Sequence, residues 1–343
     1  MSFKRLETDD FVVSADSISS TLWSTGNPTL STFFTSSTQE ASTSGDYYLN
    51  IYNTGSSLSG STVQFAIAYG NSIGSGSANY NNLVDGRSPS STIYGQYQNL
   101  VIGDENTDFT FGTITASEFF ALSIDRAQYK EKLFLGSLSL TLSGSSGSIT
   151  LTDDSAYASS VVFNEAGRVY QLISGSAGTK DTSLNTNGYS ANSGSYGWLL
   201  PDIGTIILNP LALADFAVSG GIGLQYSGSA SATSAPNVTP MSSLFKSISG
   251  STSFRLNSEE TITSNYVFVR PRSSEFNYSE NPSFISGSTG EVLYSEFINS
   301  PQTYITTVGL YNDNSELLAV AKLSRPLVKD FTKEALVRVK LDF

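Results

Sequence analysis

The two residue types that most often carry enzymatic proton transfer and metal binding are missing from this sequence. Its 343 residues include neither histidine nor cysteine. Without them the chain has no Ser-His-Asp triad, no Cys-His dyad, no imidazole proton shuttle and no ordinary zinc site. It also has no disulfide framework. Only carboxylates, tyrosine, lysine and oxygen-bound cations remain for chemistry, so we expect a protein that is not an enzyme and needs no cofactor.

The densest group of oxygen-bearing side chains lies between Asp104 and Asp108, with Glu105, Asn106 and Thr107 between them. Oxygen ligands at this density suit Ca²⁺. A calcium loop of the EF-hand type, however, needs a glycine at its turn and a glutamate at its last ligand position, and this segment has neither. We interpret the group as an acidic turn before a strand that begins at Phe109, and predict no bound metal.

Paired carboxylates are the machinery of sugar hydrolysis, and a serine- and glycine-rich β protein can be a lectin or a depolymerase. The chain has 30 acidic residues, but no pair stands out from the sequence. The regular repeat of a stacked β-helix is also missing. We interpret the acidic residues mainly as surface charge that favours solubility.

Basic residues concentrate in the last quarter of a chain whose formal net charge is -12. The overall charge argues against a general nucleic-acid binder, which needs a basic surface to displace counterions from phosphates. A local basic group can still guide a partner with an acidic surface. The alternative, given equal weight, is that these basic residues are ordinary charges on the solvent-exposed face of strands. The residues concerned are Arg270, Arg272, Lys322, Arg325, Lys329, Lys333, Arg338 and Lys340.

The end of the chain has the clearest strand pattern. Residues 304–311 and 317–323 are rich in apolar and β-branched side chains and flank a short polar segment, which predicts a β-hairpin. In residues 335–343, apolar side chains alternate with Arg338, Lys340 and Asp342, which predicts a strand with one buried face and one face toward water or a neighbour. The residues predicted to stabilise this module or contact a neighbour are Arg325, Lys329, Val337, Arg338, Val339, Lys340, Leu341 and Phe343.

The composition predicts an all-β protein. Charged residues make up only 14% of the chain, whereas helices usually carry many charged side chains on their wet faces. The 12% of aromatic residues is enough to build cores, so we reject wholesale disorder. Only one or two short helices are expected, over residues 90–101 and 210–216.

The length of the strands and of the loops between them changes along the chain, and this predicts two domains. Residues 1–70 and 251–343 share long alternating strands, which we assign to a discontinuous outer β-sandwich domain. Residues 71–250 have shorter strands and longer serine- and glycine-rich loops, and we assign them to an inserted β-rich domain. Two consecutive domains are the alternative. Within the insert, residues 174–196 are expected to form an exposed loop.

No signal for export or membrane insertion is evident in the sequence. The N-terminal residues lack an apolar signal core, and no later apolar run approaches membrane-spanning length. We expect synthesis in a cytoplasm and no membrane partner.

Four segments resemble virion structural proteins of tailed bacteriophages. The longest runs from Val308 to Leu327 (VGLYNDNSELLAVAKLSRPL) and is similar to the C-terminal β module of baseplate and tail-attached proteins of contractile-tailed, cyanophage-like phages. The others are Arg87–Tyr94 (RSPSSTIY), Leu122–Lys130 (LSIDRAQYK) and Gly197–Gly204 (GWLLPDIG). Together they contain 45 of the 343 residues.

This resemblance implies a β-sandwich with an inserted second β domain, as in some baseplate wedge proteins. It also implies a non-enzymatic component of the virion, in the tail or baseplate, that joins neighbouring subunits as a homo-oligomer or as part of a large symmetric assembly. An alternative location in the virion is the neck, the collar or the site where fibres attach. The alternative function is a carbohydrate-binding adhesin or polysaccharide depolymerase of a tail fibre or spike. No functional residue carries over, because the work of the family is assembly.

Overall fold

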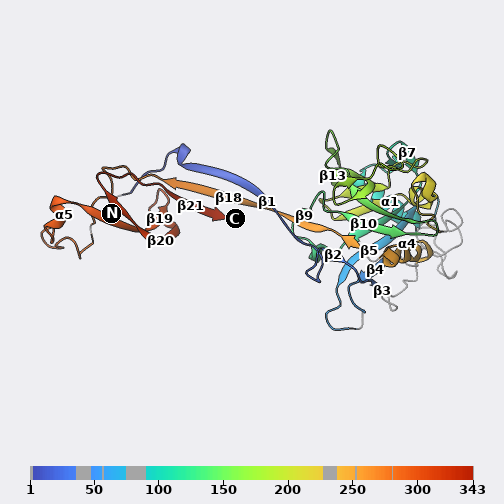
Figure 1. Ribbon diagram of the computed structural model, residues 1–343, viewed down its shortest axis with the longest axis horizontal. Helices are drawn as coiled ribbons and strands as arrows, with labels where there is room; N and C mark the ends of the chain where they lie inside the picture. Colours follow the sequence, from blue (N-terminus) through green and yellow to red (C-terminus); the bar gives the residue numbers. More distant parts are fainter. Residues whose placement is uncertain are drawn as a thin grey trace. The chain divides into compact units, whose positions relative to one another are not determined.

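The computed structural model describes residues 3–35, 48–55, 58–74, 90–226, 238–251, 253–279 and 281–342. The chain divides into two compact units (Figure 1). Unit 1 comprises Met1–Ser17 and Thr261–Phe343, and unit 2 comprises Ile18–Glu260. Strands predominate throughout the described chain, which confirms the all-β class. The unit limits differ from the boundaries predicted at residues 70 and 251.

Unit 2 is built on a 13-stranded antiparallel sheet, counted over the described residues. Eleven of its strands follow one path, and two short strands, β12 (Val162–Asn164) and β14 (Thr179–Lys180), flank β13. In spatial order the path is β2 (Thr29–Leu30), β17 (Phe254–Arg255), β10 (Ser139–Ser143), β11 (Ser148–Asp153), β13 (Gly167–Ser176), β15 (Gly197–Leu200), β16 (Thr205–Leu208), β8 (Glu118–Ile124), β5 (Val63–Asn71), β4 (Leu49–Tyr52) and β3 (Phe34–Thr35).

The central strands of this sheet are buried on both faces. Successive side chains of a strand point to opposite faces, so Phe120 and Leu122 of β8 enter one core while Phe119 and Ala121 enter the other. Two helices, α2 (Pro210–Ala214) and α4 (Val238–Ser251), contribute to the first core. The second core is covered by α1 (Ser90–Val101) and by a hairpin of β6 (Phe109–Phe111) and β7 (Ile114–Ala116).

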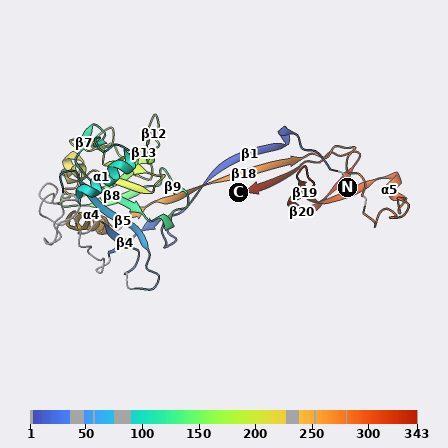
Figure 2. The same ribbon diagram turned by 180° about the vertical axis from the view of Figure 1, so that it is seen from behind.

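The sheet curls around its first core, and the two ends of the path converge there. The ring of Phe254, in β17, lies 5.4 Å from the ring of Phe65, in β5, and Trp23 contacts both rings. Figures 1 and 2 show the curled strands with α1 and α4 packed against them. Edge-on aromatic contacts of this kind add to the stabilisation by burial.

Unit 1 consists of two small sheets. One contains β1 (Phe11–Thr21), β18 (Asn257–Val269) and β21 (Val337–Asp342), with β18 in the middle. The other is a hairpin of β19 (Gln302–Tyr311) and β20 (Leu317–Asp330). Hydrophobic side chains of β18 and β21 pack with those of the hairpin, a sandwich-like arrangement. The first residues of β18, up to Glu260, belong to unit 2, where Ser258 and Glu259 pair with β9 (Lys132–Leu133).

Several element predictions hold, and others are wrong. The helices at 90–101 and 210–216 and the C-terminal hairpin are confirmed. The described chain nevertheless has four α-helices rather than one or two, since α4 and α5 (Glu296–Asn299) were not predicted. The remaining short helical turns are η1 (Thr8–Asp10), η2 (Arg126–Gln128) and η3 (Ala217–Ser219).

Two parts of the domain prediction differ from the structure for identifiable reasons. The strands β4 and β5, expected in the outer domain, pair with each other and β5 pairs with β8, so they belong to unit 2. The polar stretch 174–196 is not a wholly exposed loop, because Ser190, Ser195 and Tyr196 are buried. The Tyr196 hydroxyl donates a 2.5 Å hydrogen bond to the carbonyl oxygen of Gly220, which anchors the end of this stretch.

Gly197 at the start of β15 adopts a backbone conformation that only glycine tolerates. Its φ is +143°, and a Cβ atom there would lie 1.9 Å from the carbonyl oxygen of Ile207 on the paired strand β16. We predict that Gly197→Ala destabilises unit 2 by about 2–4 kcal/mol, through strain and overpacking. The measurement is urea unfolding followed by tryptophan fluorescence.

Gly95→Ala in α1 is the matched control. A Cβ at Gly95 meets no atom within 4 Å, so the same substitution should stabilise the helix by about 0.5–1 kcal/mol. Equal effects of the two substitutions would contradict the assignment of strain to Gly197.

Candidate assembly surface

Unit 1 has a small buried core. Among its described residues, only three hydrophobic side chains are buried: Val267 of β18 with Val337 and Val339 of β21. All the other buried hydrophobic side chains of the described chain belong to unit 2. Because hydrophobic burial is the main term that offsets the entropy of folding, unit 1 gains little stability from its own core.

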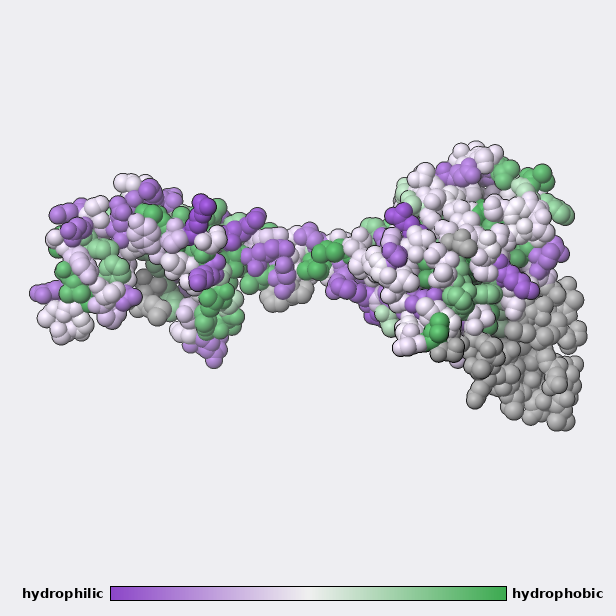
Figure 3. Space-filling model, turned by 60° about the horizontal axis from the view of Figure 1, so that its bottom comes forward, coloured by the Kyte–Doolittle hydropathy of each residue, from purple (hydrophilic) through white to green (hydrophobic). Residues whose placement is uncertain are grey.

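Unit 1 instead exposes many large hydrophobic side chains, some of them visible on its surface in Figure 3. It is the smaller unit, yet it carries more than half of the exposed large hydrophobic residues in the described chain. Exposed apolar surface beyond scattered single residues marks an interaction site. On the strands, the exposed set is Phe11, Val12, Val13, Tyr304, Tyr311, Leu317, Leu318 and Val320, and outside them it is Phe3, Leu6, Tyr278, Val292, Leu293, Tyr294, Ile298, Phe331 and Leu336.

The C-terminal strand β21 has the alternation that the sequence predicts. Val337 and Val339 are buried and Leu341 is partly buried, while Arg338 and Lys340 are exposed. Phe343, also predicted to be buried, lies outside the described residues. β21 pairs with β18 rather than with the neighbouring hairpin.

The exposed face of β21 is basic and is organised around Tyr266 of β18. The guanidinium carbon of Arg338 lies 5.4 Å from the centre of the Tyr266 ring, and the Lys340 ammonium lies 6.0 Å from it. Lys340 also forms a 3.0 Å ion pair with Asp342. The hydrogen bond to Asp342 raises the pKa of Lys340, and the charges of Asp342, Tyr266 and Asp16 act in the same direction. Lys340 therefore stays charged at neutral pH.

The two basic residues predicted on β20 have different environments. Arg325 is exposed, as a partner contact requires. Lys329 is 0% exposed, so of the two roles predicted for it, stabilising the module or contacting a neighbour, only the first is compatible with its burial. Its ammonium donates hydrogen bonds of 3.0, 2.8 and 3.0 Å to the carbonyl of Ser273, the side-chain oxygen of Asn277 and the carbonyl of Asp330. Lys329 thus holds the loop after β18 against β20.

The acidic group at residues 104–108 uses its carboxylates locally. Asp104 accepts hydrogen bonds from the backbone of Asn106 at 3.0 Å and from the Thr107 hydroxyl at 2.5 Å. These bonds, that of Thr107 first, lower the pKa of Asp104. Asp108 accepts a 3.1 Å hydrogen bond from the Tyr94 hydroxyl of α1. Within the part of the chain that the structure describes, no group of three or more acidic residues is arranged to hold a metal ion.

We therefore predict that Ca²⁺ does not stabilise this protein. Its melting temperature should be the same with Ca²⁺ and with a chelator, in the wild type and in the Asp104→Asn, Asp108→Asn double variant. Binding to the folded state alone would raise the melting temperature. A rise with Ca²⁺ that is lost in the double variant would contradict this prediction, and differential scanning fluorimetry decides between the two.

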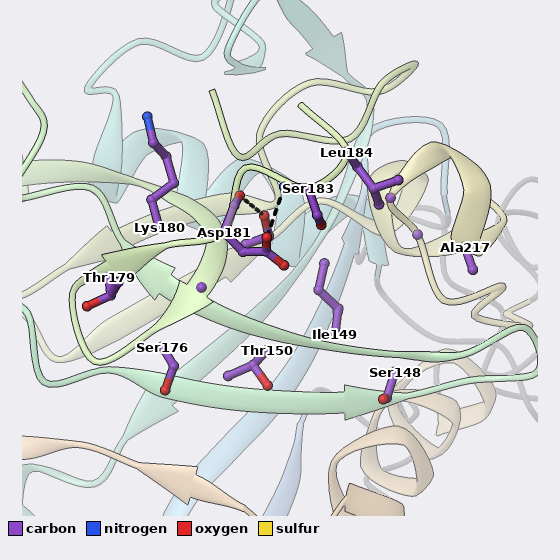
Figure 4. Close-up of a pocket in the computed structure, with 14 residues that line it drawn as sticks. Ser148, Ile149, Thr150, Ser176, Thr179, Lys180, Asp181, Ser183, Leu184 and Ala217 are labelled. Carbon is purple, nitrogen blue, oxygen red and sulfur yellow. Dashed lines mark hydrogen bonds between the residues drawn. The ribbon is translucent and has the colours of Figure 1, made fainter. Parts of the chain in front are cut away.

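Unit 2 has a polar cleft of about 610 Å³ (Figure 4). It lies between β11, β13, the loop after β14 and the turn at Ala217, and its lining contains no aromatic side chain. Asp181 accepts a 2.9 Å hydrogen bond from the backbone of Ser183, and the Lys180 side chain points away from Asp181 toward the ring of Tyr157. The cleft therefore lacks both a ring to stack on a sugar and a second carboxylate for hydrolysis.

Comparison with known proteins gives no relative: no protein-family model, curated protein or solved structure matches the chain. Among the described helices, none has the length and apolar character needed to cross a membrane.

Proposed function

We propose that this protein is a non-enzymatic structural component of a bacteriophage virion, most consistent with the tail or baseplate, and that it joins neighbouring subunits through unit 1. The observation that carries the joining role is the contrast in unit 1 between three buried valines and a long series of exposed apolar side chains. A monomeric domain rarely exposes that much apolar surface, whereas a domain that is completed by its neighbours does.

The phage assignment is supported by the sequence resemblance, of which the longest segment, Val308–Leu327, forms most of the β19–β20 hairpin. The hairpin carries exposed Tyr311, Leu317, Leu318 and Val320, so the segment that resembles virion proteins is also one that offers apolar surface to a partner. A protein of the neck, the collar or a fibre-attachment site would need the same kind of exposed apolar surface.

The direct test is mass spectrometry of particles purified from the virus that encodes this chain. We expect the protein in washed particles at a fixed ratio to other tail proteins, and particles without a functional tail when the gene is deleted. Its absence from particles, with normal tails after deletion, would overturn the proposal.

The polar cleft provides the test of the alternative function. An adhesin or depolymerase would bind or cleave surface polysaccharide of the host as the purified protein. We expect neither binding nor cleavage, because the cleft lacks the aromatic and paired carboxylate side chains that such activity uses. Cleavage that is lost in Asp181→Asn would favour the alternative.

A further inference from the structure

The polar cleft of unit 2 opens where two neighbouring strands of the sheet separate. β11 and β13 pair at residues 151–153 and 172–174, and their pairing ends there. Within the described chain, residues 148–150 of β11 pair with β10 only, because β13 turns away to pair with β14. These three residues line the cleft, and the loop after β14 lines it as well (Figure 4). One wall of the cleft is therefore an open edge of the sheet.

The backbone groups of Ser148 and Thr150 point away from β10, toward the cleft. Thr150 lies opposite Thr141 of β10, and the Thr141 N–H donates a 3.1 Å hydrogen bond to the carbonyl of Ser253, on the side away from β11. Opposite residues of an antiparallel pair either exchange both hydrogen bonds or both point their groups away, so the N–H and C=O of Thr150 point away from β10. The same holds two residues earlier, at Ser148.

The turn between β13 and β14 keeps this edge open. Gly175, where β13 leaves β11, has a φ of +149°, and a Cβ there would lie 2.1 Å from the carbonyl oxygen of Thr179. The Gly178 N–H donates a 2.8 Å hydrogen bond to the Thr152 hydroxyl, which fixes the turn against the sheet. The cleft is thus formed before any ligand arrives, and a preformed site spends less binding energy on ordering.

The lining of the cleft suits an extended peptide. Nine of its fourteen lining residues are serine, threonine or glycine, whose small side chains let another backbone approach the edge. Among these described lining residues Asp181 is the only acid, and the one base, Lys180, points its side chain away from it. Ile149 is partly buried and Leu184 is 55% exposed, so both can contact an aliphatic side chain. The volume lies in the range of ligand sites.

We propose that the cleft binds an extended peptide segment of a partner protein, which adds a strand to the open edge of β11. In this mode of recognition, main-chain hydrogen bonds, here to Ser148 and Thr150, supply the affinity, and side-chain contacts supply the selectivity. The lining selects a segment with a lysine or arginine beside Asp181 and an aliphatic side chain over Ile149 and Leu184. This site belongs to unit 2 and goes beyond the proposed function, which rests on the exposed surface of unit 1.

The experiment measures binding of defined peptides to the full-length chain by fluorescence polarisation. The probes are fluorescein-labelled eight-residue peptides of alternating threonine and valine, with amidated C-termini and one lysine moved through every position. We expect the tightest probe to lose at least about tenfold in affinity when alternate backbone nitrogens are methylated, because methylation removes hydrogen-bond donors from the added strand. This comparison uses the wild-type protein only.

Two variants of the chain locate the site. Ser148→Pro removes an N–H that points to the cleft, at the first residue of β11, where a strand tolerates proline. It should weaken binding about three- to tenfold. Ser148→Ala, which keeps that N–H, is the matched control and should bind within about twofold of the wild type. Asp181→Asn should weaken the lysine peptides about two- to fivefold and leave an all-neutral peptide unchanged.

Amide exchange measured by NMR tests the edge directly. In the free protein the amides of Ser148 and Thr150 should exchange fast and that of Ile149, which faces β10, slowly. The tightest peptide should slow the exchange of Ser148 and Thr150.

Three results would overturn the proposal. The first is that none of the peptides binds at up to about 1 mM, a weak affinity of about -4 kcal/mol. The second is binding that neither backbone methylation nor Ser148→Pro weakens, which would place the peptide elsewhere. The third is protection of Ser148 and Thr150 by host polysaccharide and by no peptide, which would make the cleft a sugar site. The assembly role of unit 1 stands or falls separately, on the presence of the protein in virus particles.

Discussion

Truncation of the chain after Leu336 will unfold unit 1 and leave unit 2 folded. The truncation removes β21, which supplies two of the three buried valines of unit 1 and the pairing partner of β18. Burial of a valine-sized side chain stabilises by about 1.5–3 kcal/mol, so the loss is about 3–6 kcal/mol. Whole domains are commonly stable by only about 5–15 kcal/mol. Unit 1, with its small core, has little stability to lose.

Limited proteolysis with mass spectrometry measures this effect. We expect rapid cleavage within residues 261–336 of the truncated chain and a resistant fragment that corresponds to unit 2, residues 18–260. Lys340→Ala, on the exposed face of the same strand, is the control and should leave the cleavage pattern of the wild type. A truncated chain that resists cleavage in residues 261–336 would show that β21 does not stabilise unit 1.

Replacement of Lys329 by methionine will have the second largest effect. Methionine is similar in length but donates no hydrogen bond, so the buried side-chain oxygen of Asn277 loses its donor. The carbonyls of Ser273 and Asp330 each lose one donor and keep another, from the Asn277 side chain and the Lys333 backbone. Each buried polar group left unpaired costs about 1–3 kcal/mol. Each of the two lost hydrogen bonds to the carbonyls contributes about 0.5–1.5 kcal/mol, so we expect a total loss of about 2–4 kcal/mol.

The matched control is Arg325→Met on the same strand, where the side chain is exposed and the expected change is within about 0.5 kcal/mol. A chain of two units need not unfold in one step, so local hydrogen exchange is the better readout. Amides of residues 273–279 should exchange faster in Lys329→Met and at the wild-type rate in Arg325→Met. Equal exchange in the two variants would refute the anchoring role of Lys329.

The strand pattern of β21 illustrates what sequence reasoning can reach. Alternation of apolar and charged residues predicted which side chains are buried, because that pattern follows from local strand geometry. The partner of β21 was not predictable, since β18 lies about 70 residues earlier in the chain and pairing at that distance leaves no local signal. The same limit explains why β4 and β5 were assigned to the wrong unit.

Lys329 and residues 190–196 show why polarity alone misplaced parts of the chain. A lysine on a strand is expected in water, and it is buried here because a distant loop supplies two acceptors and the adjacent Asp330 supplies a third. The polar stretch that ends at Tyr196 is buried for a similar reason. Asn209 donates from its side chain to the carbonyls of Ser193 and Ser195, which satisfies backbone groups that would otherwise need water.

The sequence of helix α4 contains the apolar spacing of a helix, but its composition obscured that pattern. Its buried residues Met241, Leu244 and Ile248 are spaced by three and four positions, as one face of a helix requires. Seven of its fourteen residues are serine, threonine or glycine, whose weak helix propensity argued against predicting a helix here. Packing against β10 in the first core outweighs that local preference.

The central claim is that unit 1 contacts neighbouring subunits, and hydroxyl-radical footprinting of the free protein and of virus particles tests it most directly. Tyr294, Tyr304 and Phe331 of unit 1 are exposed in the chain, as are Tyr157 and Phe163 of unit 2. The account predicts that the three unit 1 residues are oxidised readily in the free protein and become strongly protected in particles, while the two unit 2 residues change much less. Equal oxidation of the unit 1 residues in both samples would contradict it.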